Sequence, residues 1–152
     1  MWLSTWTTQS QASLPPGIRI GEKSDPFIRY TDQVIDLTRY VDLRSGKDYR
    51  FIGAISGLRN RTEIEPLFPL RGLPEFVNAQ IRGELCLEEN ESPDEGRYVG
   101  WLYLEEVEAA ISHQGFTKED LSLAVNVLLE IMSYLEKKIG KKRVRLVFEI
   151  TD

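Results

Sequence analysis

The sequence predicts a single α+β domain over residues 1–152, in which a small, mostly antiparallel sheet packs against a long C-terminal amphipathic helix and one or more shorter helices. Two observations carry this prediction. Apolar residues recur at helical spacing over residues 118–139, and an alternating apolar pattern typical of a strand follows at residues 142–150. A long amphipathic helix followed directly by such a strand favours an α+β domain.

The helix predicted at residues 118–139 has the clearest ends. Thr117 is a suitable N-cap, Glu119 and Asp120 favour the first turn through the helix dipole, and Gly140 ends the helix. Its expected buried stripe consists of Leu121, Ala124, Val125, Leu128, Met132, Leu135 and Ile139. In the strand that follows, the residues expected on one face are Val144, Leu146, Phe148 and Ile150.

Two shorter helices are predicted upstream. The first lies within residues 48–60, with Asp48 as its N-cap and Gly57 at its C-terminal end. The second lies within residues 103–115, and it ends at Gly115. Its expected buried face consists of Leu104, Val107 and Ile111.

The remaining segments are less regular. Residues 1–26 are interpreted as a loosely attached N-terminal segment or an edge strand, and residues 27–43 fit a helix or strands equally well. Residues 61–74 contain three prolines and are expected to be irregular. Residues 87–96 read as an acidic, solvated loop.

Charge and composition narrow the function classes. The formal net charge of −5 argues against binding of nucleic acid or anionic lipid, and no apolar run approaches the ~20 residues that span a bilayer. The single cysteine, Cys86, fits a reducing compartment, so we expect a cytoplasmic protein. The one basic run is interpreted as solvated residues at a helix end and on the outer face of a strand: Lys141, Lys142, Arg143 and Arg145.

Catalytic and cofactor signals are weak. One histidine and one cysteine cannot supply the usual zinc ligands, and no phosphate-binding glycine loop is present, so neither a metal nor a cofactor is predicted. His113 is interpreted as a partner of a helix C-terminus, and Cys86 as a buried apolar group. We therefore predict no catalytic residue.

Three phrases in order, "GKDYRFIGAISGLRN", "PLFPLRGLPEFV" and "GWLYLEEV", together with the terminal "VRLVFEITD", resemble a family of small uncharacterised bacterial and phage proteins. The resemblance covers about residues 44–104 and the last ten, and it implies a related fold without implying a function. Two departures stand out. The family's histidine-containing phrases have no counterpart, and Tyr103 replaces a threonine that would cap the following helix.

One polar cluster is a candidate binding site: Arg59, Asn60, Arg61 and Arg71. Arginines brought together by the proline-rich loop could hold an anion or an acidic partner. The alternative is that Arg71 bonds to local carbonyls or carboxylates and fixes the corner of the chain.

Two functions follow as hypotheses. The leading one is a non-enzymatic cytoplasmic accessory protein, of phage or mobile-element type, that binds another protein or associates with itself. The alternative is an anion-binding or small-ligand-binding protein, or an enzyme, that uses the arginine cluster beside "RGLP".

Overall fold

The computed structural model describes residues 1–10, 27–37, 46–58, 64–74, 81 and 97–151. It contains a four-stranded sheet in the order β2-β1-β4-β3, with every neighbouring pair antiparallel. The described strands are β1 Trp2–Ser10, β2 Phe27–Asp36, β3 Arg97–Tyr103 and β4 Val144–Thr151. The described helices are α1 Gly46–Ser56, α3 Leu104–His113 and α4 Leu123–Ile139, with a short 3-10 turn at Lys118–Asp120. The α+β prediction is confirmed.

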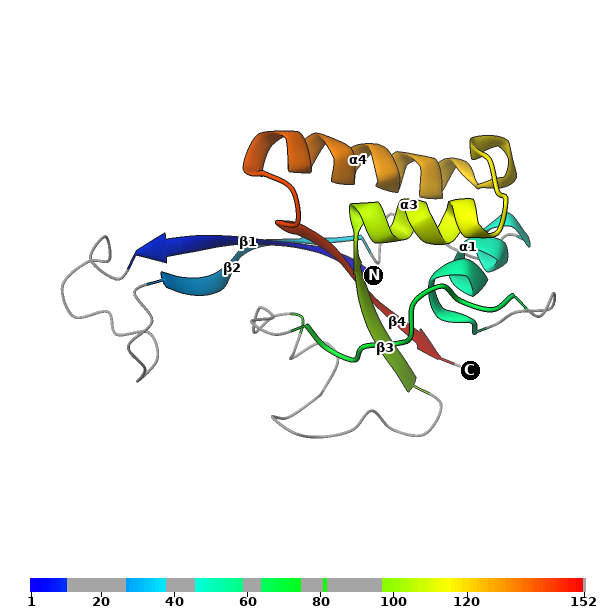
Figure 1. Cartoon of the computed structure of the whole chain (residues 1–152), viewed down its shortest axis with the longest axis horizontal. Coiled ribbons are helices and arrows are strands. Elements are labelled where there is room, and N and C mark those ends of the chain that lie inside the picture. Colours follow the sequence, from blue (N-terminus) through cyan, green and yellow to red (C-terminus); the bar gives the residue numbers. More distant parts are fainter. Residues whose placement is uncertain (11–26, 38–45, 59–63, 75–80, 82–96, 152) are drawn as a thin grey trace.

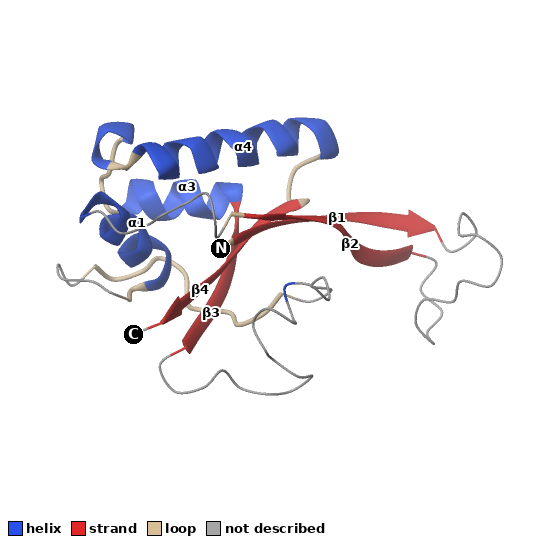
Figure 2. Cartoon of the chain, turned by 180° about the vertical axis from the view of Figure 1, so that it is seen from behind, coloured by secondary structure: helices blue, strands red, loops and turns tan. Residues whose placement is uncertain are grey.

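The main core lies between the sheet and these helices. In Figures 1 and 2, α3 and α4 run side by side over the sheet, and α1 lies beside α3 near the end of β4. Large side chains that are fully buried there come from β1, α1, β3, α4 and β4: Leu3, Phe51, Leu102, Leu128, Met132, Leu146 and Phe148. Strand side chains alternate between faces, so a second, smaller cluster forms on the opposite face from Ile81, Val99 and Val147, with Leu73 and Trp101 packed against it.

The N-terminal strand lies inside the sheet. Residues Trp2–Thr5 of β1 pair with β4 on one side, while the whole of β1 pairs with β2 on the other. The outer halves of β1 and β2 therefore extend as a two-stranded ribbon, seen to the left in Figure 1. This arrangement resolves residues 27–36 as a strand, whereas residues 11–26 and 38–45 lie outside the described part of the chain.

The long helix is confirmed, but its predicted start is wrong. The backbone N–H and the hydroxyl of Thr117 both donate to the Asp120 carboxylate, at 2.9 and 3.0 Å, and this closes the 3-10 turn. Leu121 is then extended, and α4 begins after Ser122, whose hydroxyl accepts a hydrogen bond from the Val125 N–H at 3.2 Å. Gly140 ends α4 as predicted.

Of the two shorter helices, α1 has a correct centre and a shifted start, whereas α3 lies where it was predicted. Helix α1 begins at Gly46, so Asp48 lies inside the first turn, buried, and is not the N-cap. Its end is as predicted, because Gly57 has a φ of +73°, which favours glycine. Helix α3 confirms the second short helix, with Leu104, Val107 and Ile111 buried.

Candidate functional site

The proline-rich loop is fixed against the outer edge of β3. The Gly72 N–H donates to the Val99 carbonyl at 3.1 Å, and Leu70 packs into the main core, whereas Leu73 joins the smaller cluster on the other face. The loop therefore holds the sheet edge from both sides. Residues 64–74 carry no helix or strand, in agreement with the prediction for that part of the segment.

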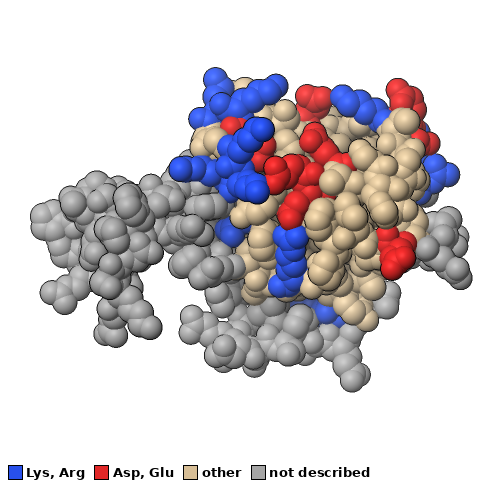
Figure 3. Space-filling model, viewed as in Figure 1, with Lys and Arg blue, Asp and Glu red and all other residues tan. Residues whose placement is uncertain are grey.

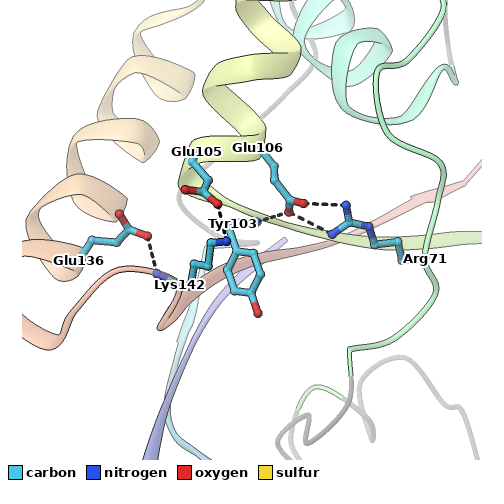
Figure 4. A network of polar contacts seen from close by, with 6 residues as sticks. All are labelled: Arg71, Tyr103, Glu105, Glu106, Glu136 and Lys142. Atoms are coloured by element: carbon cyan, nitrogen blue, oxygen red, sulfur yellow. Dashed lines mark hydrogen bonds and ion pairs between the residues drawn. The ribbon is translucent and has the colours of Figure 1, made fainter.

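Arg71 makes a two-bond ion pair with Glu106, the third residue of α3. Its Nη1 and Nη2 donate to the two carboxylate oxygens at 3.0 and 2.7 Å, and both side chains are partly buried (Figure 4). Glu106 also accepts a hydrogen bond from the Tyr103 N–H at 3.0 Å. The same carboxylate thus caps α3 and binds the loop, which supplies the cap that the Tyr103 side chain does not give.

Aromatic rings cover the Arg71 guanidinium. Its Cζ lies 4.9 Å from the Trp101 ring centroid and 5.5 Å from that of Phe68. Trp101 in turn packs edge-on against Tyr103, with centroids 5.2 Å apart. The surroundings of Arg71 match the structural interpretation, in which this arginine fixes the corner.

Arg145 was expected to be solvated, and this interpretation is wrong. Its side chain is only 5% exposed, and its Cζ lies 5.9 Å from the Trp101 centroid. Burial lowers the pKa of Arg145, although a nearby Tyr103 opposes the shift. The ordinary pKa of an arginine is so high that the side chain keeps its charge at neutral pH.

Lys142 connects the start of α3 to the end of α4. Its Nζ lies 3.0 Å from Glu105 Oε1, and its backbone N–H donates to Glu136 Oε1 at 3.2 Å (Figure 4). The hydrogen bond that Lys142 donates to Glu105 raises the pKa of Lys142, so this amine stays protonated and is a poor nucleophile. Glu105 and Glu106 are therefore both in ion pairs. These pairs join the start of α3 to the proline-rich loop through Arg71 and to the segment after α4 through Lys142.

The other predicted site residues cannot be placed beside Arg71. Arg59, Asn60 and Arg61 lie outside the described residues, so the arginine cluster stays a prediction. Cys86 and the acidic loop also lie outside them. His113 is exposed in the last turn of α3. Among the described residues, no group of three or more histidine, cysteine, aspartate or glutamate side chains could hold a metal ion.

The outward face of α4 carries a surface that the sequence reasoning missed. Leu123 is 80% exposed, Val127 47% and Tyr134 61%. With Glu130 they follow a 4-3-4 spacing and fall within an arc of about 60° around the helix, opposite the buried Val125, Leu128 and Met132. We call Leu123, Val127, Glu130 and Tyr134 the α4 seam. The sequence contains this pattern as a second heptad-spaced row on the helix face opposite the core stripe.

Charge is unevenly distributed around the α4 seam. Lysines gather at its C-terminal end, where Figure 3 shows basic side chains at the upper left: Lys137, Lys138, Lys141 and Lys142. At the other end, Lys118 of the 3-10 turn lies 3.5 Å from Glu130, and Glu119 is exposed. The α4 seam is the candidate functional site.

Comparison with protein-family models, with curated proteins and with solved structures found no match to this chain. The family resemblance drawn from "RGLP" and its neighbours stays a prediction. No helix among the described residues is long and apolar enough to cross a membrane.

Proposed function

We propose that this protein is a non-enzymatic accessory protein that acts by protein–protein association through the α4 seam. The observation that carries the proposal is the exposure of three large apolar side chains in one row, Leu123, Val127 and Tyr134. Single exposed apolar residues are ordinary, but several on one face of a helix, here with Glu130 between Val127 and Tyr134, are typical of interaction surfaces.

The position of the α4 seam supports this proposal. Helix α4 is fixed from beneath by Val125, Leu128 and Met132 and at its end by the Glu136–Lys142 hydrogen bond. A helix held this firmly presents its outer row without a backbone ordering cost on binding, which favours association. A cytoplasmic location, expected from the single cysteine, belongs to the same proposal.

The test compares variants of the α4 seam with a matched surface control. Leu123→Ser combined with Val127→Ser removes two of the three apolar side chains of the row, whereas Leu67→Ser removes an apolar side chain that is 41% exposed in the proline-rich loop. Complexes are detected by size-exclusion chromatography and by chemical crosslinking, both on pure protein and in native lysate. We expect a complex for the wild type and Leu67→Ser, and its loss in the double variant.

Circular dichroism verifies that the double variant is folded. The proposal is wrong if the wild type gives only the 17.5 kDa chain under every condition. It is also wrong if complexes form equally well without the apolar row.

The alternative, an anion site at Arg59, Asn60, Arg61 and Arg71, ranks second. Its ligand would have to displace the Glu106 carboxylate from Arg71. Glu106→Gln should then strengthen the thermal stabilisation given by phosphosugars or nucleotides. No stabilisation of either form would rule this alternative out.

A further inference from the structure

We propose that the proline-rich loop, residues 64–74, opens as a unit while the rest of the domain stays folded, and that Glu106 is the latch that holds it closed. The Glu106 carboxylate binds Arg71 of the loop and also caps α3, so opening of the loop is coupled to the first turn of that helix. This conformational device is separate from the α4 seam and does not depend on the proposed function.

The loop has few of the contacts that hold a segment in place. It forms no helix or strand, and Pro66, Pro69 and Pro74 have no N–H to donate. Within residues 64–74, Pro74 alone is buried. Segments with little buried surface and few backbone hydrogen bonds open at a lower free energy than the whole domain unfolds. The burial and composition of the loop therefore favour local opening.

The Arg71–Glu106 ion pair is the strongest polar contact that the structure gives the loop. It has two hydrogen bonds between charged groups, at 3.0 and 2.7 Å, and both side chains are partly buried (Figure 4). The neutral contacts of the loop include two hydrogen bonds and two partly buried apolar side chains: Gly72 N–H to the Val99 carbonyl at 3.1 Å, the Gln114 side chain to the Glu65 carbonyl at 2.9 Å, Leu70 and Leu73.

Glu106 couples the loop to the start of α3. One of its carboxylate oxygens, Oε2, accepts both from Arg71 Nη1 and from the Tyr103 N–H, each at 3.0 Å. Arg71 thus fixes the orientation in which Glu106 caps the helix. When the loop opens and removes Arg71, the carboxylate is less firmly held, and the cap on the Tyr103 N–H weakens with it.

Opening of the loop uncovers the outer edge of β3. The Val99 carbonyl loses the Gly72 N–H, and the Trp101 ring loses the guanidinium that lies 4.9 Å from its centroid. An open strand edge is a template for pairing with another chain, and proteins commonly cover such edges with a loop. The latch therefore protects this edge of the sheet.

Native-state hydrogen exchange of the full chain, followed by NMR over a urea series below the unfolding transition, tests local opening. The Gly72 amide reports the loop, and the Leu128 amide in the middle of α4 reports the domain core. We expect Gly72 to exchange with a smaller opening free energy and a weaker urea dependence than Leu128. Equal values for the two amides would mean that the loop opens only when the domain unfolds, and the proposal would be wrong.

Two adjacent carboxylates provide a variant and its matched control. Glu106→Gln removes the charge that binds Arg71, whereas Glu105→Gln removes a charge in the same helical turn that pairs with Lys142 instead. We expect Gly72 to exchange about tenfold faster in Glu106→Gln, because charge-assisted hydrogen bonds are roughly twice as strong as neutral ones. Glu105→Gln should leave the Gly72 rate unchanged. Equal rates in the two variants would remove Glu106 as the latch.

The Tyr103 amide tests the coupling to α3. Arg71→Ala leaves both partners of the Tyr103–Glu106 hydrogen bond in place, yet we expect it to speed exchange at Tyr103 as well as at Gly72, at urea concentrations where Leu128 does not exchange. Arg71→Lys keeps the charge without the two parallel bonds, so its effect should be intermediate, and it replaces Arg71→Ala if that variant does not fold. A Tyr103 rate that is unchanged while Gly72 exchanges faster would overturn the coupling.

Discussion

Gly100 of β3 lies opposite Phe148 of β4 in the sheet. A Cβ there would stand 2.6 Å from the Phe148 ring and 2.9 Å from Leu70. Gly72, in the loop, has a φ of +70° but open space around it. The two glycines are therefore required for different reasons, one steric and one conformational.

Alanine at these two positions should separate the two reasons. We expect Gly100→Ala to lower the free energy of unfolding by about 1–3 kcal/mol through overpacking. Gly72→Ala should cost about 1 kcal/mol through backbone strain alone. Urea denaturation measures both, and a larger cost for Gly72→Ala would contradict the packing described around Gly100.

The Arg71–Glu106 pair is the second residue-scale feature with a measurable energy. Because it has two hydrogen bonds and is partly buried, we expect a coupling of about 1–2 kcal/mol between the two side chains. A double-mutant cycle with Arg71→Ala and Glu106→Ala measures it in urea. A coupling near zero would show that the loop is held by Leu70, Leu73 and Gly72 alone.

Sequence reasoning identified only Arg71 of this pair. The glycine and prolines around Arg71 predicted a fixed corner, and pairing with a carboxylate was one of two alternatives. Glu106 lies 35 residues away, and only folding brings it to Arg71. For the same reason, the burial of Arg145 beneath Trp101 could not be read from a basic run.

At the scale of elements, the start of α4 is the feature that sequence reasoning placed five residues too early. The helical apolar pattern extends back to Leu121. However, the Asp120 carboxylate accepts hydrogen bonds from the backbone N–H and the hydroxyl of Thr117, and this closes a separate turn. Local hydrogen bonds of this kind compete with helix propagation. Residues 27–36 were ambiguous for another reason: pairing with β1, a long-range contact, made them a strand.

Capping substitutions test this boundary. Ser122→Ala removes the acceptor for the Val125 N–H and should cost about 1 kcal/mol of stability. Thr117→Ala leaves the backbone bond to Asp120 in place and should cost less. Thermal unfolding compares the two, and the reverse order would mean that α4 starts at the 3-10 turn.

The Asp120 carboxylate gives the same turn a pH dependence. The hydrogen bond from the Thr117 backbone, followed by that from its hydroxyl, lowers the pKa of Asp120 in the folded state. A lowered folded pKa stabilises the protein above the ordinary aspartate pKa of about 3.9, and this contribution disappears as the pH falls through the folded value. Asp120→Asn should thus be less stable than the wild type at pH 7, with the two melting temperatures converging in acid. A gap that widens in acid would contradict this sign.

At the scale of the whole molecule, the sequence predicted the α+β class because its C-terminal third combines a long amphipathic helix with a strand. It did not predict that β1 lies inside the sheet, because strand order depends on which distant segments pair. The α4 seam escaped notice for a different reason. A search for one apolar stripe assigns the strongest row to the core, and exposure of the second row is visible only once the helix is docked.

Association through the α4 seam is the claim on which the function depends. Sedimentation velocity over a concentration series, run on the wild type and on Val127→Glu, tests it most directly, because a charge in the middle of the α4 seam opposes any apolar contact there. We expect the wild type, alone or as labelled chain in native lysate, to sediment above the 17.5 kDa chain mass, while Val127→Glu stays at the chain mass with an unchanged circular dichroism spectrum. Identical association of the two proteins would contradict the claim.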